Sequence, residues 1–348
     1  MIKVMIVDDS AVVRSMLREQ LGSEPDIEVV GVAHDPLFAL QKLDTLCPDV
    51  LVVDVEMPRM DGLTFLRQLM QQKPIPTIVF SSLAEQGSAI ALDAMDAGAV
   101  AILCKPGMGV GQFIQEQRAQ LVQTVRQAAG ARLRGVGRRA AESALVIPPR
   151  NALVVNQTTD AIVALGTSTG GTRALEYLLS RLPRDCTGLV IVQHMPANFT
   201  RQFAERLDAV CAIEVREARD GDRVMPGRAL IAPGGLHLSV RRNGAQYQVQ
   251  VQDGPPVSRH KPSVDVLFRS LAQTAGRNAA GVIMTGMGDD GARGLKAMRE
   301  AGALTLAQDE ASCVVFGMPK EAIRLGAVEH VCSLDEIPLR IAHFGQKV

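Results

Sequence analysis

The sequence lacks several features that would place the chain outside the ordinary globular proteins. None of its apolar runs reaches eighteen residues, the length that a membrane-spanning helix needs, so we expect no membrane insertion. Only six apolar residues precede the acidic pair that begins at position 8, which is too few for a secretory signal. The six cysteines form no Cys-x-x-Cys pair, which favours reduced thiols over disulfides or zinc. These absences predict a cytoplasmic protein.

The composition is that of a folded protein with two domains of ordinary size. Of the 348 residues, 47% are hydrophobic and 21% are charged, and the net charge is zero. The charge is unevenly distributed, because residues 1–128 contain 10 basic and 16 acidic side chains whereas residues 129–157 contain five arginines and one glutamate. An acidic first domain on a basic connector argues against nucleic acid as a partner.

Residues 1–128 alternate short apolar runs with helical patterns. Predicted strands lie at 2–7, 28–33, 49–54, 77–82 and 100–104, and predicted helices at 11–21, 36–46, 63–70, 88–97 and 113–128. Five such βα units predict a parallel, doubly wound sheet that is buried on both faces.

The next segment, 129–157, keeps no period and is rich in Gly, Arg and Pro, so we expect an interdomain linker. Strand–helix alternation resumes in residues 158–348 and predicts a second, mainly parallel α/β domain. Its predicted strands lie at 160–165, 189–193, 229–232, 237–241, 247–251, 280–285 and 303–307, with helices at 173–182 and 292–301. The pair around 243–244 is typical of a hairpin.

Polar side chains follow four strands of the first domain. Asp8 and Asp9 follow the first strand, Asp54 the third, Ser81 the fourth and Lys105 the fifth. The carboxyl ends of parallel strands meet at one edge, where three converging carboxylates require a divalent cation. Mg²⁺ suits such an all-oxygen site, and the lysine and hydroxyl can contact a phosphoryl group. Attack of one carboxylate on a phosphate would give an aspartyl phosphate.

These residues resemble the receiver domain of two-component response regulators over about residues 1–128. The resemblance rests on Val-Asp-Asp at 7–9, Asp54 followed by Met57-Pro58 and Asp61-Gly62, Ser81, and Lys105-Pro106. It implies that Asp54 is the phosphoacceptor, that Asp9 and Asp54 bind Mg²⁺ directly, that Asp8 acts through water and that Glu56 contributes its carbonyl. Ser81 and Lys105 would contact the phosphoryl group.

One position departs from the common receiver pattern. Receivers often carry an aromatic switch residue three positions before the lysine, and this chain has Ile102 there. Reorientation of an aromatic ring is therefore not expected to transmit the signal, although phosphorylation itself is unaffected by this difference.

In the second domain, residues 166–171 form a glycine-rich turn between a strand and a helix. Such a turn could bind a phosphate on its backbone N–H groups, but it lacks a P-loop lysine and the spacing of a dinucleotide fingerprint. Gly-x-Ser-x-Gly is also the pattern of a nucleophile elbow, which would expose the hydroxyl of Ser168.

A serine nucleophile needs a base and a carboxylate. His194 directly follows the apolar run 189–193, which is a suitable position for a base or for a core histidine. His260 lies in a loop and could contact substrate. Asp289 and Asp290 follow another apolar run and could be a catalytic acid or only a helix N-cap. The resulting order Ser, His, Asp disfavours a true α/β-hydrolase fold.

Several long motifs resemble the chemotaxis protein-glutamate methylesterase (CheB) family, in order and over essentially the whole chain. They are Gly-x-Ser-Thr-Gly-Gly at 166–171, Gln-His-Met at 193–195, Ile-Ala-Pro-Gly at 231–234, Lys-Pro-Ser-Val-Asp-Val-Leu-Phe at 261–268, Thr-Gly-Met-Gly-x-Asp-Gly at 285–291 and Ala-Ser-Cys-Val-Val-Phe-Gly-Met-Pro at 311–319. The resemblance places the catalytic residues at Ser168, His194 and Asp290, and the oxyanion contacts at the backbone of Thr169 and Met287.

The resemblance implies a hydrolase, without a cofactor of its own, that removes γ-glutamyl methyl esters from methyl-accepting chemoreceptors and can also deamidate glutamines. A histidine kinase would phosphorylate Asp54, and the unphosphorylated receiver would block the active site. Two alternatives are a nucleotide-binding output domain and a non-catalytic signalling adaptor.

Overall fold

The chain forms two compact units, Met1–Ser143 and Ala144–Val348, each of which is described by itself. The computed structural model describes residues 1–57, 59–81, 90, 93–95, 97–105, 111–131, 161–197 and 199–345, with no side chains for 104 and 111–117. Most of the linker predicted at 129–157 and half of the helix predicted at 88–97 lie outside these residues. No helix in the described ranges is long and apolar enough to span a bilayer.

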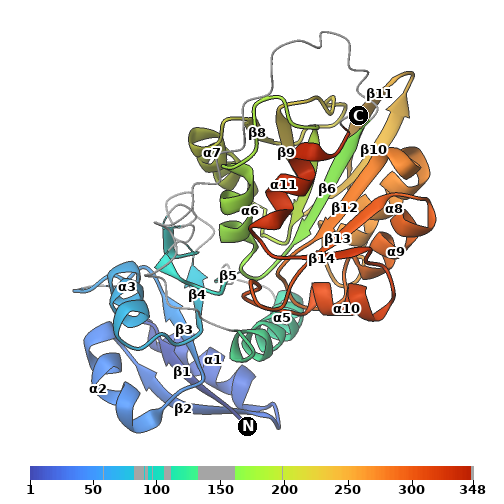
Figure 1. Cartoon of the computed structure of the whole chain (residues 1–348). Helices are drawn as coiled ribbons and strands as arrows, with labels where there is room; N and C mark the ends of the chain where they lie inside the picture. Colours follow the sequence, from blue (N-terminus) through green and yellow to red (C-terminus); the bar gives the residue numbers. More distant parts are fainter. Residues whose placement is uncertain are drawn as a thin grey trace. The chain divides into compact units, whose positions relative to one another are not determined.

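The first unit is built on a parallel sheet with the strand order β2-β1-β3-β4-β5 (Figure 1). Its strands are β1 Ile2–Val7, β2 Ile27–Ala33, β3 Val50–Asp54, β4 Thr77–Ser81 and β5 Ala101–Cys104, and its helices are α1 Ala11–Gly22, α2 Pro36–Leu46, α3 Gly62–Gln72 and α5 Gly111–Ala129. All four strand pairs are parallel, as the apolar runs predict. The side chains of Ser10, Asp35 and Asp61 cap the three helices that follow them.

The second unit contains a seven-stranded sheet in which every pair is parallel, with the order β14-β13-β12-β6-β7-β9-β8. Its strands are β6 Ile162–Thr167, β7 Leu189–Gln193, β8 Glu214–Glu217, β9 Arg228–Ile231, β12 Ala279–Ile283, β13 Leu304–Gln308 and β14 His330–Cys332. The helices are α6 Gly171–Leu179, α7 Phe199–Val210, α8 Val264–Thr274, α9 Ala292–Glu300, α10 Met318–Arg324 and α11 Glu336–His343.

The predicted hairpin is present beside this sheet. Strands β10 (His237–Asn243) and β11 (Gln246–Gln252) pair antiparallel, with Asn243 opposite Gln246. The two-residue loop therefore begins at Gly244, which takes the left-handed conformation (φ +59°) that such a loop requires.

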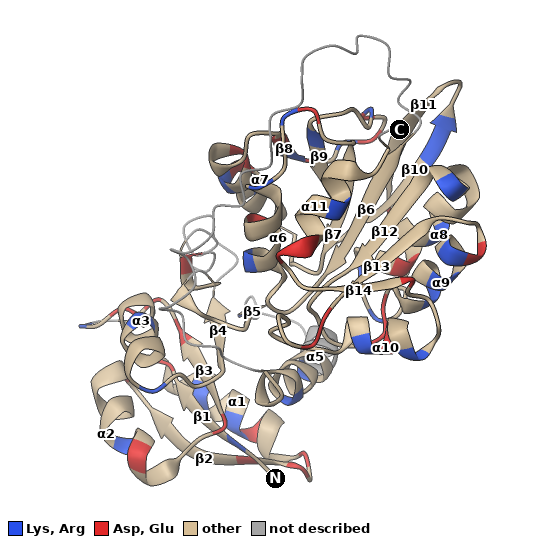
Figure 2. Cartoon of the chain, viewed as in Figure 1, with Lys and Arg blue, Asp and Glu red and all other residues tan. Residues whose placement is uncertain are grey.

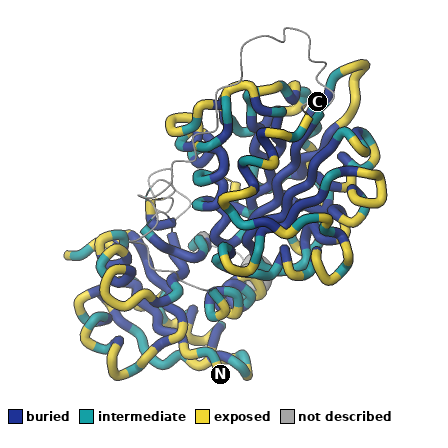
Figure 3. The backbone as a smooth tube through the Cα atoms, in the orientation of Figure 1, coloured by how far each residue is buried: buried dark blue, intermediate teal, exposed yellow. Residues whose placement is uncertain are grey.

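The centre of the second sheet is a buried, uncharged core. The side chains of β6, β7, β12 and β13 include no Lys, Arg, Asp or Glu, and charges gather instead on the helices and on the exposed end of the hairpin (Figure 2). Every residue of β6, β7 and β12 is buried (Figure 3). Burial on both faces explains why these strands are continuously apolar rather than alternating.

The strand order places a topological switch point next to β6. The chain leaves β6 toward β7 on one side, and strand β12 later joins β6 on the other side. In open α/β sheets a ligand crevice forms beyond the carboxyl ends of the strands at such a point. The residues that follow β6, β7 and β12 are therefore the first to consider as a functional site.

Candidate functional site

The nucleophile candidate, Ser168, directly follows β6 in a tight turn that leads into α6. Its backbone N–H donates to the Thr285 carbonyl (3.0 Å), and its own carbonyl accepts from Gly171 (2.8 Å). Gly170 has φ +76°, which a side chain would strain. A Cβ at Gly171 would lie 2.1 Å from Gln193 Oε1, so this turn can approach β7 only with glycine there.

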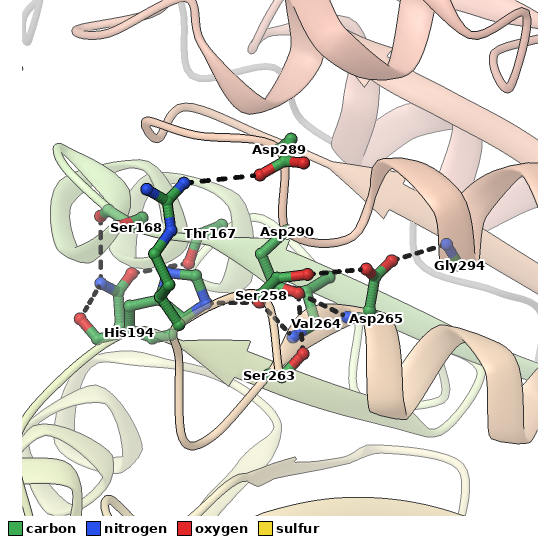
Figure 4. A network of polar contacts seen from close by, with 12 residues as sticks. Thr167, Ser168, His194, Ser258, Ser263, Val264, Asp265, Asp289, Asp290 and Gly294 are labelled. Carbon is green, nitrogen blue, oxygen red and sulfur yellow. Dashed lines mark hydrogen bonds and ion pairs between the residues drawn. The ribbon is translucent and has the colours of Figure 1, made fainter. Parts of the chain in front are cut away.

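His194 and Asp290, from the loops after β7 and β12, meet beside this turn (Figure 4). His194 Nε2 lies 2.8 Å from Asp290 Oδ2, and the two side chains are 8% and 0% exposed. A carboxylate only accepts, so Nε2 carries the proton that is donated to it. Nδ1 is buried and has no hydrogen-bond partner among the described residues. The hydrogen bond at Nε2 thus fixes the tautomer and orientation of the imidazole and leaves Nδ1 available as a base.

Asp290 accepts three further hydrogen bonds at the start of α8. Its oxygens receive Ser263 Oγ (2.7 Å), the Val264 N–H (2.7 Å) and the Asp265 N–H (3.1 Å). Burial alone would raise the pKa of Asp290, but the hydrogen bond and positive charge of His194, with the other donors, outweigh burial and lower it. Asp290 is therefore an anion held against the partial positive charge of a helix N-terminus.

The two helices that meet here cap each other. Asp290 caps α8 rather than α9, the helix that follows it, whose own N-cap is Gly291 with no side-chain hydrogen bond. In return Asp265, in the first turn of α8, accepts from the Gly294 N–H of α9 (2.6 Å). The possibility that Asp290 caps the next helix is thus wrong, and its carboxylate is instead shared between α8 and His194.

Asp289 has a different environment from its neighbour. Its side chain is 37% exposed and pairs with Arg293 (3.3 Å) and Arg259 (3.8 Å). It has no hydrogen bond to His194 among the contacts found. Of the two acids left open by the sequence, Asp290 alone contacts the histidine.

Gln193 was not predicted to act at the site, although it stands next to His194. Its Nε2 donates to the carbonyls of Ser168 and His194 (both 3.0 Å), and its Oε1 accepts from Thr167 Oγ1 (2.6 Å). This buried amide joins the nucleophile turn to the histidine loop. The motif Gln-His-Met contained the residue, but only the fold shows what the amide contacts.

The two predicted oxyanion contacts lie in hydrogen-bonded turns. Thr169 is buried, and the peptide that carries its N–H is held through the Ser168 carbonyl, which accepts from the Gly171 N–H (2.8 Å) and from Gln193 Nε2 (3.0 Å). Met287 lies between Gly286, whose carbonyl accepts from Gly317 and Met318 (3.0 and 2.8 Å), and Gly288 with φ +89°. These bonds fix the two peptides, and donation from their N–H groups to an oxyanion stays a prediction.

The first unit gathers the predicted acidic cluster at the carboxyl edge of its sheet. One carboxylate oxygen each from Asp8, Asp9 and Asp54 lies within 4.8 Å of the others, with Asp9 exposed and the other two buried. Lys105 Nζ contacts Asp54 (2.7 Å) and Asp8 (3.0 Å). Burial raises the pKa of Asp54 more than Lys105 lowers it.

The remaining receiver residues lie around this cluster. Ser81 is fully buried at the end of β4, and the Glu56 N–H donates to Asp54 Oδ1 (3.0 Å). Crowded carboxylate oxygens are the donor set that a hard divalent cation prefers. The residues therefore fit a Mg²⁺ ion, which the sequence predicts here.

Comparison with known proteins assigns both units. The model of the CheB methylesterase family matches residues 163–341, and the model of the response regulator receiver domain matches residues 4–114. The chain belongs to the CheB methylesterase family. It is therefore a hydrolase that carries a receiver domain, as the sequence motifs predict, and the matches support neither a nucleotide-binding output domain nor a non-catalytic adaptor.

Relatives of full length give the same assignment for this CheB-family chain. It is 58% identical to "Protein-glutamate methylesterase/protein-glutamine glutaminase 3" of Shewanella oneidensis, with 99% of both chains covered. It is also 58% identical to a protein of the same description, numbered 2, from Dechloromonas aromatica, with 99% of this chain and 98% of that one covered. The crystal structure of the Thermotoga maritima CheB methylesterase catalytic domain is 36% identical, with a TM-score of 0.52, and matches 53% of this chain and 97% of that one.

Proposed function

We propose that this CheB-family enzyme hydrolyses γ-glutamyl methyl esters of chemoreceptors, with Ser168 as nucleophile, His194 as general base and Asp290 as the acid that orients His194. The observation that carries the proposal is the buried 2.8 Å contact between His194 Nε2 and Asp290, next to the Ser168 turn at the switch point of the sheet. The names of the full-length relatives support this class of substrate.

The chemistry follows from which nitrogen of His194 is occupied. Because Nε2 donates to Asp290, Nδ1 accepts the proton of Ser168 as Oγ attacks the ester carbonyl. The backbone N–H groups of Thr169 and Met287 stabilise the oxyanion, at about 3 kcal/mol for one good donor. As the intermediate collapses and the C–O bond of the ester breaks, His194 gives its proton to the leaving methoxide oxygen, which departs as methanol.

The acyl-enzyme is hydrolysed by the reverse use of the same groups. His194 Nδ1 takes a proton from water, whose oxygen attacks the acyl carbonyl, and returns that proton to Ser168 Oγ as the free glutamate leaves. Deamidation of a receptor glutamine differs only in that ammonia leaves instead of methanol. The relatives' names, which include protein-glutamine glutaminase, support this second activity.

We further propose that phosphorylation controls this activity in the cytoplasm. A histidine kinase supplies the phosphoryl group that Asp54 accepts, with Ser81 and Lys105 as contacts and with Mg²⁺ held by Asp8, Asp9, Asp54 and the Glu56 carbonyl. Bound Mg²⁺ would neutralise the charge that develops on the transferred group.

The unphosphorylated receiver, residues 1–128, would itself block receptor access to Ser168 in the catalytic domain, residues 158–348, and the linker at 129–157 would act as a tether. A coupling free energy of about 1.4 kcal/mol suffices for tenfold activation. Signal transmission without an aromatic residue at position 102 would then depend on other contacts of the receiver.

Methanol release from methylated receptor membranes tests the proposal. Ser168→Ala should abolish release with or without a small phosphodonor, and Asp54→Asn should remove only the stimulation that the phosphodonor causes. Retained hydrolysis in Ser168→Ala would refute the nucleophile, and equal wild-type rates with and without phosphodonor would refute the switch.

A further inference from the structure

His194 has a second close neighbour that the proposed triad does not use. The imidazole of His260 lies parallel to that of His194, with ring centroids 3.7 Å apart and an angle of 7° between the ring planes. His260 comes from the loop before α8, more than sixty residues further along the chain. Its ring covers one face of the catalytic imidazole, whereas Asp290 contacts the edge.

The loop holds His260 in a tight turn. Val257 and His260 exchange two backbone hydrogen bonds (3.1 and 2.9 Å), so that only Ser258 and Arg259 lie between them. Both of these residues have positive φ, +50° and +68°, which is the geometry of a two-residue hairpin turn. Such turns favour Asn and Gly, so Ser and Arg are strained here, and strained backbone persists only where surrounding contacts hold it.

One of these contacts joins the turn to the catalytic acid. Ser258 Oγ donates to Asp265 Oδ2 (3.1 Å), and the Asp265 N–H donates to Asp290 Oδ1 (3.1 Å). Asp265 is itself fully buried. The ring that lies on His194 and the carboxylate that binds His194 are therefore fixed to the same residue.

The charge state of His260 suits a ring-stacking role. Burial lowers its pKa to about 3, and nearby His194 and Arg259 add to this effect, while Asp290 opposes it. His260 is therefore neutral at pH 7. A neutral aromatic face is compatible with an adjacent imidazolium, whereas a second positive charge would repel it.

We propose that His260 is a positioning residue whose stacked ring limits rotation of the His194 imidazole about its Cβ–Cγ bond. Rotation about this bond would turn the imidazole out of the parallel arrangement and into the ring of His260. Nε2 thus stays on Asp290 and Nδ1 stays available to Ser168. This role rests on the proposed use of His194 as base.

Two substitutions separate this role from its alternatives. His260→Phe keeps a flat, neutral ring but removes both nitrogens, and His260→Ala removes the ring. His330→Ala is the matched control, since His330 is 42% exposed on β14 and contacts neither Ser168 nor His194 among the described contacts. The full-length protein is measured by methanol release from methylated receptor membranes and by the rate at which phenylmethylsulfonyl fluoride inactivates it, which needs no receptor.

We expect His260→Ala to lower kcat and the inactivation rate together, by up to about 100-fold, the effect of misplacing a reacting group by about 1 Å, with KM nearly unchanged. His260→Phe should restore both rates to near the wild-type values, with the same number of ionisations in its pH profile. His330→Ala should match the wild type. If His260→Ala does not fold, as judged by thermal unfolding, His260→Gln replaces it.

Three results would overturn the proposal. Equal losses in His260→Phe and His260→Ala would mean that a ring nitrogen is needed. A raised KM with an unchanged inactivation rate would mean that His260 contacts the receptor. Full activity in His260→Ala would mean that the stack has no function. Failure of the triad itself is recognised separately, because Ser168→Ala would then remain active while His260 is intact.

Discussion

Replacement of Asp290 by Asn probes the site most directly, because the surroundings dictate how the amide must lie. Oδ2 of Asp290 receives two N–H donors, from His194 and Val264, and the backbone N–H of Val264 cannot accept a hydrogen bond. Oδ1 receives the Ser263 hydroxyl, which can rotate, and the more distant Asp265 N–H. We therefore expect the Asn carbonyl at the Oδ2 position and its NH₂ group at the Oδ1 position.

This orientation of the amide decides how much kcat/KM falls in Asp290→Asn. The carbonyl still accepts from His194 Nε2, so the tautomer is retained and only the negative charge is lost. A charge pair about 4 Å apart at an effective dielectric constant near 20 is worth about 4 kcal/mol, which corresponds to about 10³ in kcat/KM. If the NH₂ group faced the histidine instead, the wrong tautomer would cost about 10⁴, as it does in the well-studied Ser-His-Asp proteases.

The assay is methanol release from methylated receptor membranes, with Asp289→Asn as the matched control. Asp289 is 37% exposed and pairs only with arginines among the contacts found, so its substitution should change kcat/KM by less than about threefold. Thermal unfolding should show a loss of about 1–3 kcal/mol for Asp290→Asn, because the Asp265 N–H loses its acceptor. A loss of activity below tenfold would refute the role of Asp290, and one of 10⁴ or more would refute the expected amide orientation.

Three other perturbations have defined outcomes. Gly171→Ala places a Cβ 2.1 Å from Gln193 Oε1 and should lower the free energy of unfolding by about 1–3 kcal/mol. Gly22→Ala is the control, because a Cβ there meets no atom within 4 Å and should be neutral or stabilising. Equal denaturant midpoints for the two variants would contradict this expectation. Mg²⁺ should raise the unfolding temperature of the receiver in calorimetry, and Asp9→Asn should remove most of this shift. The pKa of His260 is about 3 in the folded protein and near 6.5 when unfolded, so the unfolded state binds more protons between these values and stability falls on acidification. Denaturant unfolding of His260→Phe from pH 7 to 5 should therefore be less acid-sensitive, by at most about 1.4 kcal/mol per pH unit, and an equal slope would contradict the buried neutral state.

The residues at strand ends were predictable because one physical rule places them. Parallel strands bring their carboxyl ends to the same edge, so Asp8, Asp54, Ser168 and His194 could each be located from the apolar run that precedes them. The boundaries of α2 and β7 agree with the prediction to the residue. The strands that were easiest to predict are those buried on both faces, where almost only apolar residues are tolerated.

What escaped prediction depends on contacts between distant segments. Helix α8 was not predicted, although Val264, Leu267, Phe268 and Leu271 have helical spacing and are fully buried, so a signal was present. The choice between Asp289 and Asp290 is different. It depends on which carboxylate reaches the start of α8, and no local pattern states this.

Contacts of single polar groups were equally hidden in the sequence. Gln193 is an ordinary residue at a strand end until its amide is seen to bind two carbonyls on separate loops. His260 was predicted to lie in a loop that could contact substrate. Its parallel approach to His194 depends on a strained turn and on Ser258, whose partner Asp265 is seven residues away. Neither arrangement produces a periodic pattern in the sequence.

The mutual capping of α8 and α9 determines which substitution should be used to make an inactive enzyme that traps a receptor complex. Asp290 accepts hydrogen bonds from the first turn of α8 as well as from His194, so its removal should loosen the start of α8 beside the site. The Ser168 hydroxyl makes no structural hydrogen bond among those found, since Ser168 is held through its own backbone N–H and carbonyl. A Ser168→Ala protein should therefore preserve the docking surface and hold the methylated receptor uncleaved, whereas a trap made at Asp290 would present an altered one.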